Sequence, residues 1–212
     1  MLRIACLHTA DSNIAVFETA LADLGLGDGV TLSHHVRADL FDDAERAGGL
    51  TQDIQRRTTE ALNALTADAD AVLLTCSTLG PTVMTGGAIV RTDAALAETA
   101  VRGGGQVVVL CAAETTLGPT RDLFGEVARG TDARVEVRLV SGAWARFRAG
   151  DHGGYLQLIA DAAEEALRQG ATTVALAQAS MAGALKLMEN RPVLASPAAG
   201  LKAAVEVGSG RV

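Results

Sequence analysis

The chain has 212 residues, and its 18 lysines and arginines against 25 aspartates and glutamates give a formal net charge of −7 at pH 7. This acidic balance argues against a nucleic-acid partner or an anionic membrane, because no run of lysine and arginine could neutralise phosphate groups. The hydrophobic fraction of 49% excludes a disordered chain, and no apolar run reaches the roughly 18 residues of a membrane-spanning helix.

Short β-branched and aliphatic runs alternate with longer stretches rich in alanine and leucine. The predicted strands are residues 2–7, 30–36, 71–74, 106–110, 134–139 and 173–176. The predicted helices are residues 13–24, 51–66, 93–102, 116–129, 154–169, 181–188 and 197–207. Several of the strands are apolar throughout, which is typical of parallel strands covered on both faces. The alternation of strand and helix predicts an α/β fold with right-handed crossovers.

The sequence also repeats itself. Residues 69–80 align without a gap on residues 171–182, a shift of 102, and residues 7–12 align on 110–115, a shift of 103. Each longer segment is a predicted strand followed by a turn of small residues that opens a helix. We therefore expect two similar α/β lobes. The first is 1–90 plus 196–212, so that the last helix returns to it, and the second is 91–195.

In open α/β sheets, ligands bind beyond the carboxyl ends of the strands. Four turns of this chain occupy such positions, namely residues 9–12, 75–78, 113–116 and 178–180. Two lobes that face each other would bring these four turns around one cleft.

The turn with the sharpest chemistry contains Thr75, Cys76, Ser77 and Thr78 and follows a predicted buried strand. Small hydroxyl residues leave backbone N–H groups open, and such groups form a nest suited to a carboxylate. A cysteine among aligned N–H groups is expected to have a lowered pKa, which makes it a better base or nucleophile. Cys76 is therefore the candidate catalytic residue, and a buried structural thiol is the alternative.

Two further turns carry polar candidates. Thr9, Asp11 and Ser12 follow the first strand, where one of them could grip an ammonium group or orient the cysteine. Thr115 and Thr116 occupy the matching turn of the second lobe and could grip a carboxylate. Capping of the helix that follows is the alternative in both turns.

The other cysteines and histidines point to no cofactor. Cys6 and Cys111 are expected to be structural, and His8, at the end of the first strand, is a weak acid/base candidate. Neither a C-x-x-C motif nor paired Cys/His spacing indicates a metal site, and no glycine-rich phosphate loop indicates a nucleotide. Asp93 is expected to cap a helix. Three widely spaced cysteines are typical of reduced thiols in a cytoplasm.

Four motifs resemble those of the aspartate/glutamate/hydantoin racemase superfamily. They are Leu-Leu-Thr-Cys-Ser-Thr at 73–78, Arg-Thr-Asp at 91–93, Glu-Thr-Thr-Leu-Gly-Pro-Thr at 114–120 and Leu-Ala-Gln-Ala-Ser-Met-Ala at 176–182. The resemblance spans nearly the whole chain. It implies a cofactor-independent fold of two similar parallel-sheet lobes related by a pseudo-twofold axis, and it suggests homo-oligomers. Racemases of this family place one cysteine after a strand in each lobe, so that one thiolate removes the α-proton and the opposite thiol returns a proton.

The chain departs from that pattern at one position. Cys76 matches the first catalytic cysteine, whereas Gln178 stands where the second would be. A primary amide does not exchange protons near neutral pH, but it can bond a developing oxyanion. The groups expected to bind the ligand are those of Thr9, Asp11, Ser12, Thr75, Ser77, Thr78, Thr115, Thr116 and Ser180.

The expected function is that of a cofactor-independent racemase-superfamily enzyme acting through Cys76 at the α-carbon of an amino acid or related small carboxylate. Two alternatives stay open because of Gln178. One is single-thiol lyase or isomerase chemistry. The family's arylmalonate decarboxylases use a single cysteine, though in the second lobe, and its maleate isomerases use the first-lobe cysteine together with the second. The other alternative is a homologue that binds a carboxylate without catalysis.

Overall fold

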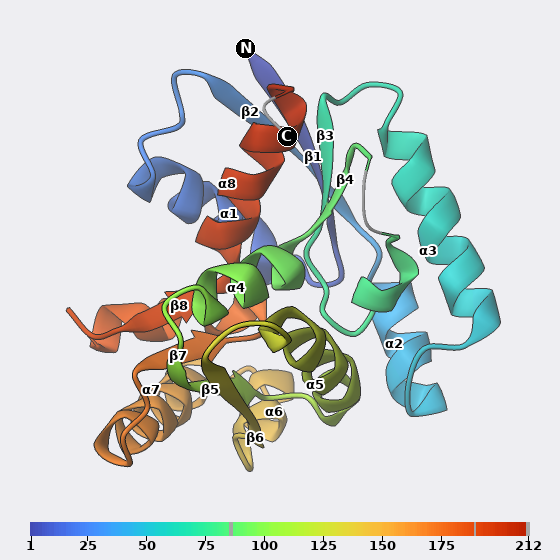
Figure 1. Ribbon diagram of the computed structural model, residues 1–212. Coiled ribbons are helices and arrows are strands. Elements are labelled where there is room, and N and C mark those ends of the chain that lie inside the picture. Colours follow the sequence, from blue (N-terminus) through green and yellow to red (C-terminus); the bar gives the residue numbers. More distant parts are fainter. Residues whose placement is uncertain (85–86, 189, 211–212) are drawn as a thin grey trace. The chain divides into compact units, whose positions relative to one another are not determined.

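Two four-stranded parallel sheets organise the chain in the computed structural model, which describes residues 1–84, 87–188 and 190–210 (Figure 1). The strand orders are β2-β1-β3-β4 and β6-β5-β7-β8, and every described strand pair is parallel. The structure therefore confirms the predicted α/β class. No helix within the described ranges is long and apolar enough to cross a membrane.

The first unit comprises Met1–Ala95 and the chain from Pro197 onward. Its elements are β1 (Leu2–His8), α1 (Ser12–Asp23), β2 (Val30–Val36), α2 (Ala38–Ala47), α3 (Gln52–Leu65), β3 (Ala71–Leu74), the 3-10 helix η1 (Gly80–Thr82) and β4 (Ile89–Arg91). Helices α1 and α3 lie on opposite sides of the sheet (Figure 1). This explains why all four residues of the inner strand β3 are buried and apolar.

The second unit comprises Leu96–Ser196. Its elements are β5 (Gly105–Cys111), α5 (Glu114–Ala128), β6 (Ala133–Leu139), α6 (Ala143–Arg148), α7 (His152–Arg168), β7 (Thr173–Leu176), the 3-10 helix η2 (Ala179–Leu187) and β8 (Val193–Ala195). Its core cluster joins the buried face of α7, with Tyr155 and Ile159, to β5 and β7.

Helices α4 (Thr92–Val101) and α8 (Ser196–Gly208) each follow the last strand of a sheet. The boundary between the units falls inside α4, after Ala95, five residues beyond the boundary expected from the sequence. Helix α8 approaches the first sheet closely. A Cβ added at Gly208 would lie 3.0 Å from Leu2 Cδ1 and 3.4 Å from the Ala71 Cβ.

The internal repeat is visible in the order of the elements. Ala71, the first residue of β3, lies 102 residues before Thr173, which begins β7, and Leu2 of β1 lies 103 residues before Gly105 of β5. Each sheet has its first strand in an inner position, between the second strand and the third. The same succession of strands and helices therefore builds both units.

The structure corrects five features of the predicted element list. Helices α2 and α6 and strands β4 and β8 were not predicted, and residues 181–187 of the helix predicted at 181–188 form part of a 3-10 helix rather than an α-helix. Strands β4 and β8 have three residues each, too few for a periodic pattern. They are ordered by pairing with β3 and β7. Helix α2 does carry an apolar stripe, Leu40, Phe41 and Ala44, among acidic residues.

Candidate functional site

Cys76 lies directly beyond the carboxyl end of β3. The N–H of Thr75 donates to the Leu7 carbonyl at 3.1 Å, which continues the pairing of β3 with β1 by one residue. The chain then turns and enters η1, where Pro81 occupies the first turn. The sequence predicted that this turn opens a helix, and the structure shows a single 3-10 turn there. The cysteine therefore stands in a tight turn at the ligand-binding edge expected of an α/β sheet.

Three hydrogen-bond donors surround the sulfur of Cys76. This residue is only 8% exposed. The Thr9 hydroxyl and the backbone N–H groups of Leu79 and Thr78 all form hydrogen bonds to it. Thr9 follows β1 and the other two follow β3, so two neighbouring strand ends build this arrangement. Such donors stabilise the negatively charged thiolate.

The net effect on the thiol is the opposite of the sequence expectation. Burial raises the pKa of Cys76 above its ordinary value. The hydrogen bonds from Thr9, Leu79 and Thr78 lower the pKa, and the charge of Asp93 raises it again. Removal of the thiol from water has the largest effect, because burial disfavours the charged form. The resting group in this protein is therefore a thiol rather than a thiolate.

Asp93 is a neighbour of Cys76 that the sequence analysis took only for a helix cap. It is buried, accepts two hydrogen bonds from Arg91 at 2.8 and 3.1 Å, and acts on the pKa of Cys76 through its charge. Gly80 makes room for this ion pair. A Cβ there would lie 2.6 Å from Arg91 Nη2 and 2.8 Å from Asp93 Oδ2. The available signal was the Arg-Thr-Asp motif at 91–93, which carries part of the family resemblance.

The three predicted ligand-binding residues of the turn after β1 have different surroundings. Thr9 is half-buried and reaches Cys76, whereas Asp11 and Ser12 are exposed at the start of α1. Asp11 is the N-cap residue, but its side chain makes no capping hydrogen bond. Asn13 was not predicted. It is buried, and its Oδ1 has no hydrogen-bond partner among the described residues. A buried acceptor without a partner is costly, so Asn13 joins the candidates for ligand binding.

Thr75 is turned into the first sheet. Its hydroxyl donates to the Leu7 carbonyl at 3.0 Å and lies 3.0 Å from His8 Nδ1. The Thr75 hydroxyl is thereby held inside the first unit by two partners of β1. Ser77 and Thr78 are both buried, at 6% and 1% exposure, in the turn that holds Cys76.

His8 is fully buried and is not placed to serve as a general acid. Burial, followed by the charges of His34 and His35, lowers the pKa of His8 to about 3, so that the neutral imidazole prevails. Burial likewise raises the pKa of the Cys6 thiol to about 12. Both groups lie in the interior of the first unit, as the sequence analysis expected for Cys6.

Gln178, in the second unit, is held by its amide oxygen. Oε1 accepts hydrogen bonds from the backbone N–H groups of Ala112 at 2.6 Å and Ala113 at 2.9 Å, which follow β5. An amide oxygen has two lone pairs, and both are used here. Only the NH2 group of Gln178 can therefore serve a ligand, as a hydrogen-bond donor.

The other candidates of the second unit lie around the starts of α5 and η2. Thr115 and Thr116 are the second and third residues of α5, whose N-cap is Ala113, so neither is the cap. Ser180, in η2, shares a hydrogen bond of 2.9 Å with the buried Tyr155 hydroxyl of α7. The structure thus brings Gln178 to the start of α5 and ties Ser180 to α7.

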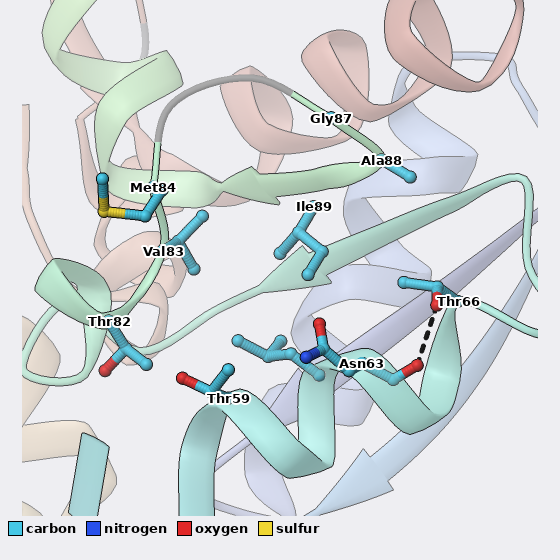
Figure 2. A pocket seen from close by; sticks show the side chains of 10 residues that line it. Thr59, Asn63, Thr66, Thr82, Val83, Met84, Gly87, Ala88 and Ile89 are labelled. Carbon is cyan, nitrogen blue, oxygen red and sulfur yellow. Dashed lines mark hydrogen bonds between the residues drawn. The ribbon is translucent and has the colours of Figure 1, made fainter. Parts of the chain in front are cut away.

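A separate pocket of about 400 Å³ lies in the first unit (Figure 2). Side chains of α3 line one wall, and the segment from η1 to β4 lines the other (Figure 2). Its described lining residues are Thr59, Leu62, Asn63, Thr66, Thr82, Val83, Met84, Gly87, Ala88 and Ile89. None of them is ionisable and none was predicted as a site residue, so the pocket supplies no acid/base group.

Comparison with solved structures finds racemases. An aspartate racemase from Picrophilus torridus matches with a TM-score of 0.78 at 13% identity, covering 99% of this chain and 95% of that one. A glutamate racemase from Bacillus anthracis matches at 0.67 and 13%, covering 98% and 80%. An allantoin racemase from Pseudomonas fluorescens matches at 0.65 and 17%, covering 100% and 92%.

Comparisons with the models of known protein families and with curated proteins find no match. The racemase likeness extends over the whole length of the chain, and identities of 13–17% make it a likeness of fold. The protein therefore has the fold of the aspartate/glutamate/hydantoin racemase superfamily.

Proposed function

We propose that this protein is a cofactor-independent enzyme of the racemase superfamily that acts through Cys76 at the α-carbon of an amino acid or a related small carboxylate. The observation that carries the proposal is the set of donors on the Cys76 sulfur, from Thr9, Thr78 and Leu79. A buried structural thiol needs no such donors, whereas a thiol that moves a proton needs its thiolate stabilised.

The proposed chemistry uses both forms of the thiol. As thiolate, Cys76 removes the α-proton, and as thiol it returns a proton to the planar enediolate. Because burial raises the pKa of Cys76, the thiol must lose its proton before it can remove the α-proton. The Gln178 NH2 group is proposed to donate to the carboxylate or the developing enediolate, since its oxygen is already bonded.

One observation favours a second candidate. Gln178 carries no exchangeable acid or base, so the position of the family's second cysteine supplies no proton. A resting thiol at Cys76 is suited to protonate a planar intermediate from one side. Lyase or isomerase chemistry with a single thiol is therefore the runner-up.

The test is proton NMR in D2O with the purified protein and a panel of amino acids, hydantoins, malonates and maleate. We expect Cys76-dependent deuterium at an α-carbon. Cys76→Ala should abolish it, and Cys111→Ala, which removes a different buried thiol, should not. Turnover that is unchanged in Cys76→Ala would contradict the proposal. Loss of carbon dioxide or a shifted double bond would select the runner-up.

Gln178→Cys separates the two stereochemical possibilities. If wild-type exchange proceeds with retention, the added thiol should introduce inversion. If the wild type already inverts its substrate, a second base other than residue 178 must act. A ligand whose binding survives Cys76→Ala, without any turnover of the panel, would favour a binding protein instead.

A further inference from the structure

Three possible metal ligands meet on one face of the first sheet. Cys6 and His8 are two residues apart on β1, so their side chains point to the same face. His34 on β2 is paired in register with Cys6. The Cys6 sulfur and one ring nitrogen from each histidine all lie within 4.8 Å of one another. Helix α1 covers this face, because Phe17 contacts the His8 ring at 5.3 Å between centroids.

The hydrogen bonds around the two histidines allow the tautomers that a metal ion would need. The Thr75 hydroxyl lies 3.0 Å from both the Leu7 carbonyl and His8 Nδ1, so it can accept from His8 Nδ1 while it donates to the carbonyl. The Glu18 carboxylate accepts from His34 Nε2 at 2.9 Å. With both outer nitrogens as donors, the inner nitrogens are left with lone pairs, which is the arrangement that a bound metal ion requires.

The two inner nitrogens, His8 Nε2 and His34 Nδ1, lie 2.9 Å apart and share a hydrogen bond in the free protein. A metal ion would take the lone pairs of both nitrogens in its place. The nearby Cys6 sulfur is a third ligand atom, which this hydrogen bond does not use and a metal ion can.

We propose that Cys6, His8 and His34 form a binding site for a borderline-soft transition-metal ion of the Zn²⁺ type. One thiolate and two imidazoles match the sulfur and nitrogen ligands that Zn²⁺ takes, and they do not suit Mg²⁺ or Ca²⁺. If the two inner nitrogens moved apart to a separation of about 3.3 Å, an ion between them would lie at the usual Zn–N distance of about 2.0–2.1 Å from each.

The outer partners complete the site. Metal-bound histidines usually donate their second ring N–H to a carboxylate or another oxygen, which fixes the ring and its tautomer. Glu18 does this for His34, and Thr75 does it for His8. Sequence spacing alone does not indicate this site, because the third ligand lies 26 residues along the chain from His8.

Entry and charge also fit an ion. Cys6 and His8 are fully buried, whereas the His34 side chain is 13% exposed and lies beside the exposed Glu18. The ion would enter along this edge. On binding, the cation replaces the Cys6 thiol proton, since Zn²⁺ deprotonates a bound thiol outright, and both imidazoles bind as neutral rings. The bound ion would join β1 to β2 and, through Glu18, to α1.

Titration of the metal-free, full-length protein with Co²⁺ tests the site. We expect one equivalent to bind with a thiolate-to-cobalt charge-transfer band, and Zn²⁺ to displace it. Cys6→Ala should remove the band, whereas Cys76→Ala and Cys111→Ala should keep it. A band lost only in Cys76→Ala would place the thiolate elsewhere and overturn the proposal, as would the absence of any thiolate band.

Histidine variants provide matched controls that do not disturb the core. His34→Ala should abolish binding, and His35→Ala, at the exposed neighbouring position of β2, should leave it intact. Glu18→Gln should weaken Co²⁺ binding by about 10- to 100-fold, the usual effect of removing an outer partner. Because the His34 side chain lies at the edge, His34→Ala should keep the fold, which circular dichroism would check. Unchanged Co²⁺ affinity in the folded variant would overturn the proposal.

Discussion

Cys76 shows how opposing influences on one side chain are balanced. Burial favours the thiol, and the three hydrogen bonds from Thr9, Leu79 and Thr78 favour the thiolate. The Asp93 charge opposes those donors from within the same unit. Because the influences oppose one another, removing a single donor should change the fraction of thiolate measurably at a given pH.

Thr9→Val tests this balance, since valine has nearly the shape of threonine without its hydroxyl. The pKa of Cys76 should rise further. Alkylation of Cys76 near pH 8 should slow by about two- to tenfold, because one hydrogen bond contributes about 0.5–1.5 kcal/mol. Peptide mass spectrometry would follow the modified cysteine. Thr9→Ser keeps the donor and should react at the wild-type rate, and equal rates in the two variants would refute the role of Thr9.

Cys111 makes stability depend on pH. Burial raises its pKa from 9.0 to about 11, so the unfolded chain releases this proton at a lower pH than the folded protein does. The contribution to stability is complete below pH 9.0 and is lost as the pH rises toward about 11. Urea unfolding of Cys111→Ala should show a smaller loss of stability over this range than the wild type. The same pH slope in both proteins would exclude this explanation.

At the scale of elements, short segments depend on their neighbours. Helix α2 carries three aspartates and is tied to α3 by Arg57, which bonds Asp43 and Asp39 at 2.6 Å each. Arg56, the preceding residue, instead bonds Asp53 and Glu60 of its own helix. Of these two adjacent arginines of α3, Arg57 links the helix to α2, whereas Arg56 bonds within α3.

Arg57→Gln should loosen α2, because two of its aspartates lose their shared cation. Hydrogen exchange of the α2 amides should become several-fold faster, and the difference from wild type should shrink at high salt as screening weakens the pairs. Arg56→Gln is the matched control, since its partners lie within α3. If both variants altered α2 exchange equally, the link between α2 and α3 would not depend on Arg57.

At the scale of the whole molecule, the same succession of strands and helices occurs twice. The last helix, α8, belongs to the same unit as the first strand, β1. The segment from Pro197 onward groups with the first unit, where Gly208 of α8 comes close to Leu2 and Ala71. Leu201 of α8 is fully buried, whereas its neighbour Lys202 is exposed. Helix α8 is therefore a part of the first unit's core rather than a free tail.

Leu201→Ala should lower the free energy of unfolding by about 2–5 kcal/mol, through lost apolar contact and the cavity left behind. Hydrogen exchange should quicken in β1 and β3 more than in β5 and β7, because α8 supports the first sheet. Lys202→Ala should leave both sheets unchanged. Equal loss of protection in the two sheets would show that α8 does not serve the first unit selectively.

Much of the fold was predictable because its inner strands are largely buried apolar runs and its strand β2 is rich in β-branched residues and alternates in burial. The predicted strands at 30–36, 71–74 and 173–176 coincide with β2, β3 and β7. The three-residue strands β4 and β8 escaped prediction, since their order comes from pairing with β3 and β7 rather than from their own residues. The apolar stripe of α2 was readable and was overlooked among its charges.

The turn around Cys76 was also predictable, because small hydroxyl residues after a buried strand leave backbone N–H groups open. The N–H of Thr78 does reach the sulfur, together with that of Leu79. The sign of the pKa shift was not predictable from the turn, since it depends on burial and on Asp93. Likewise, the amide of Gln178 was predicted to donate, but the structure alone shows that its oxygen is taken.

By itself, the sequence determined the alternation of strand and helix, the repeat near 102 residues and the place of the thiol at a strand end. Local runs of residues specify these features, because burial and turn chemistry act over a few neighbours. Only the tertiary structure decided that Cys76 rests as a thiol and that His34 stands beside Cys6 and His8. Desolvation and strand register come from residues distant in the chain, so no local pattern contains them.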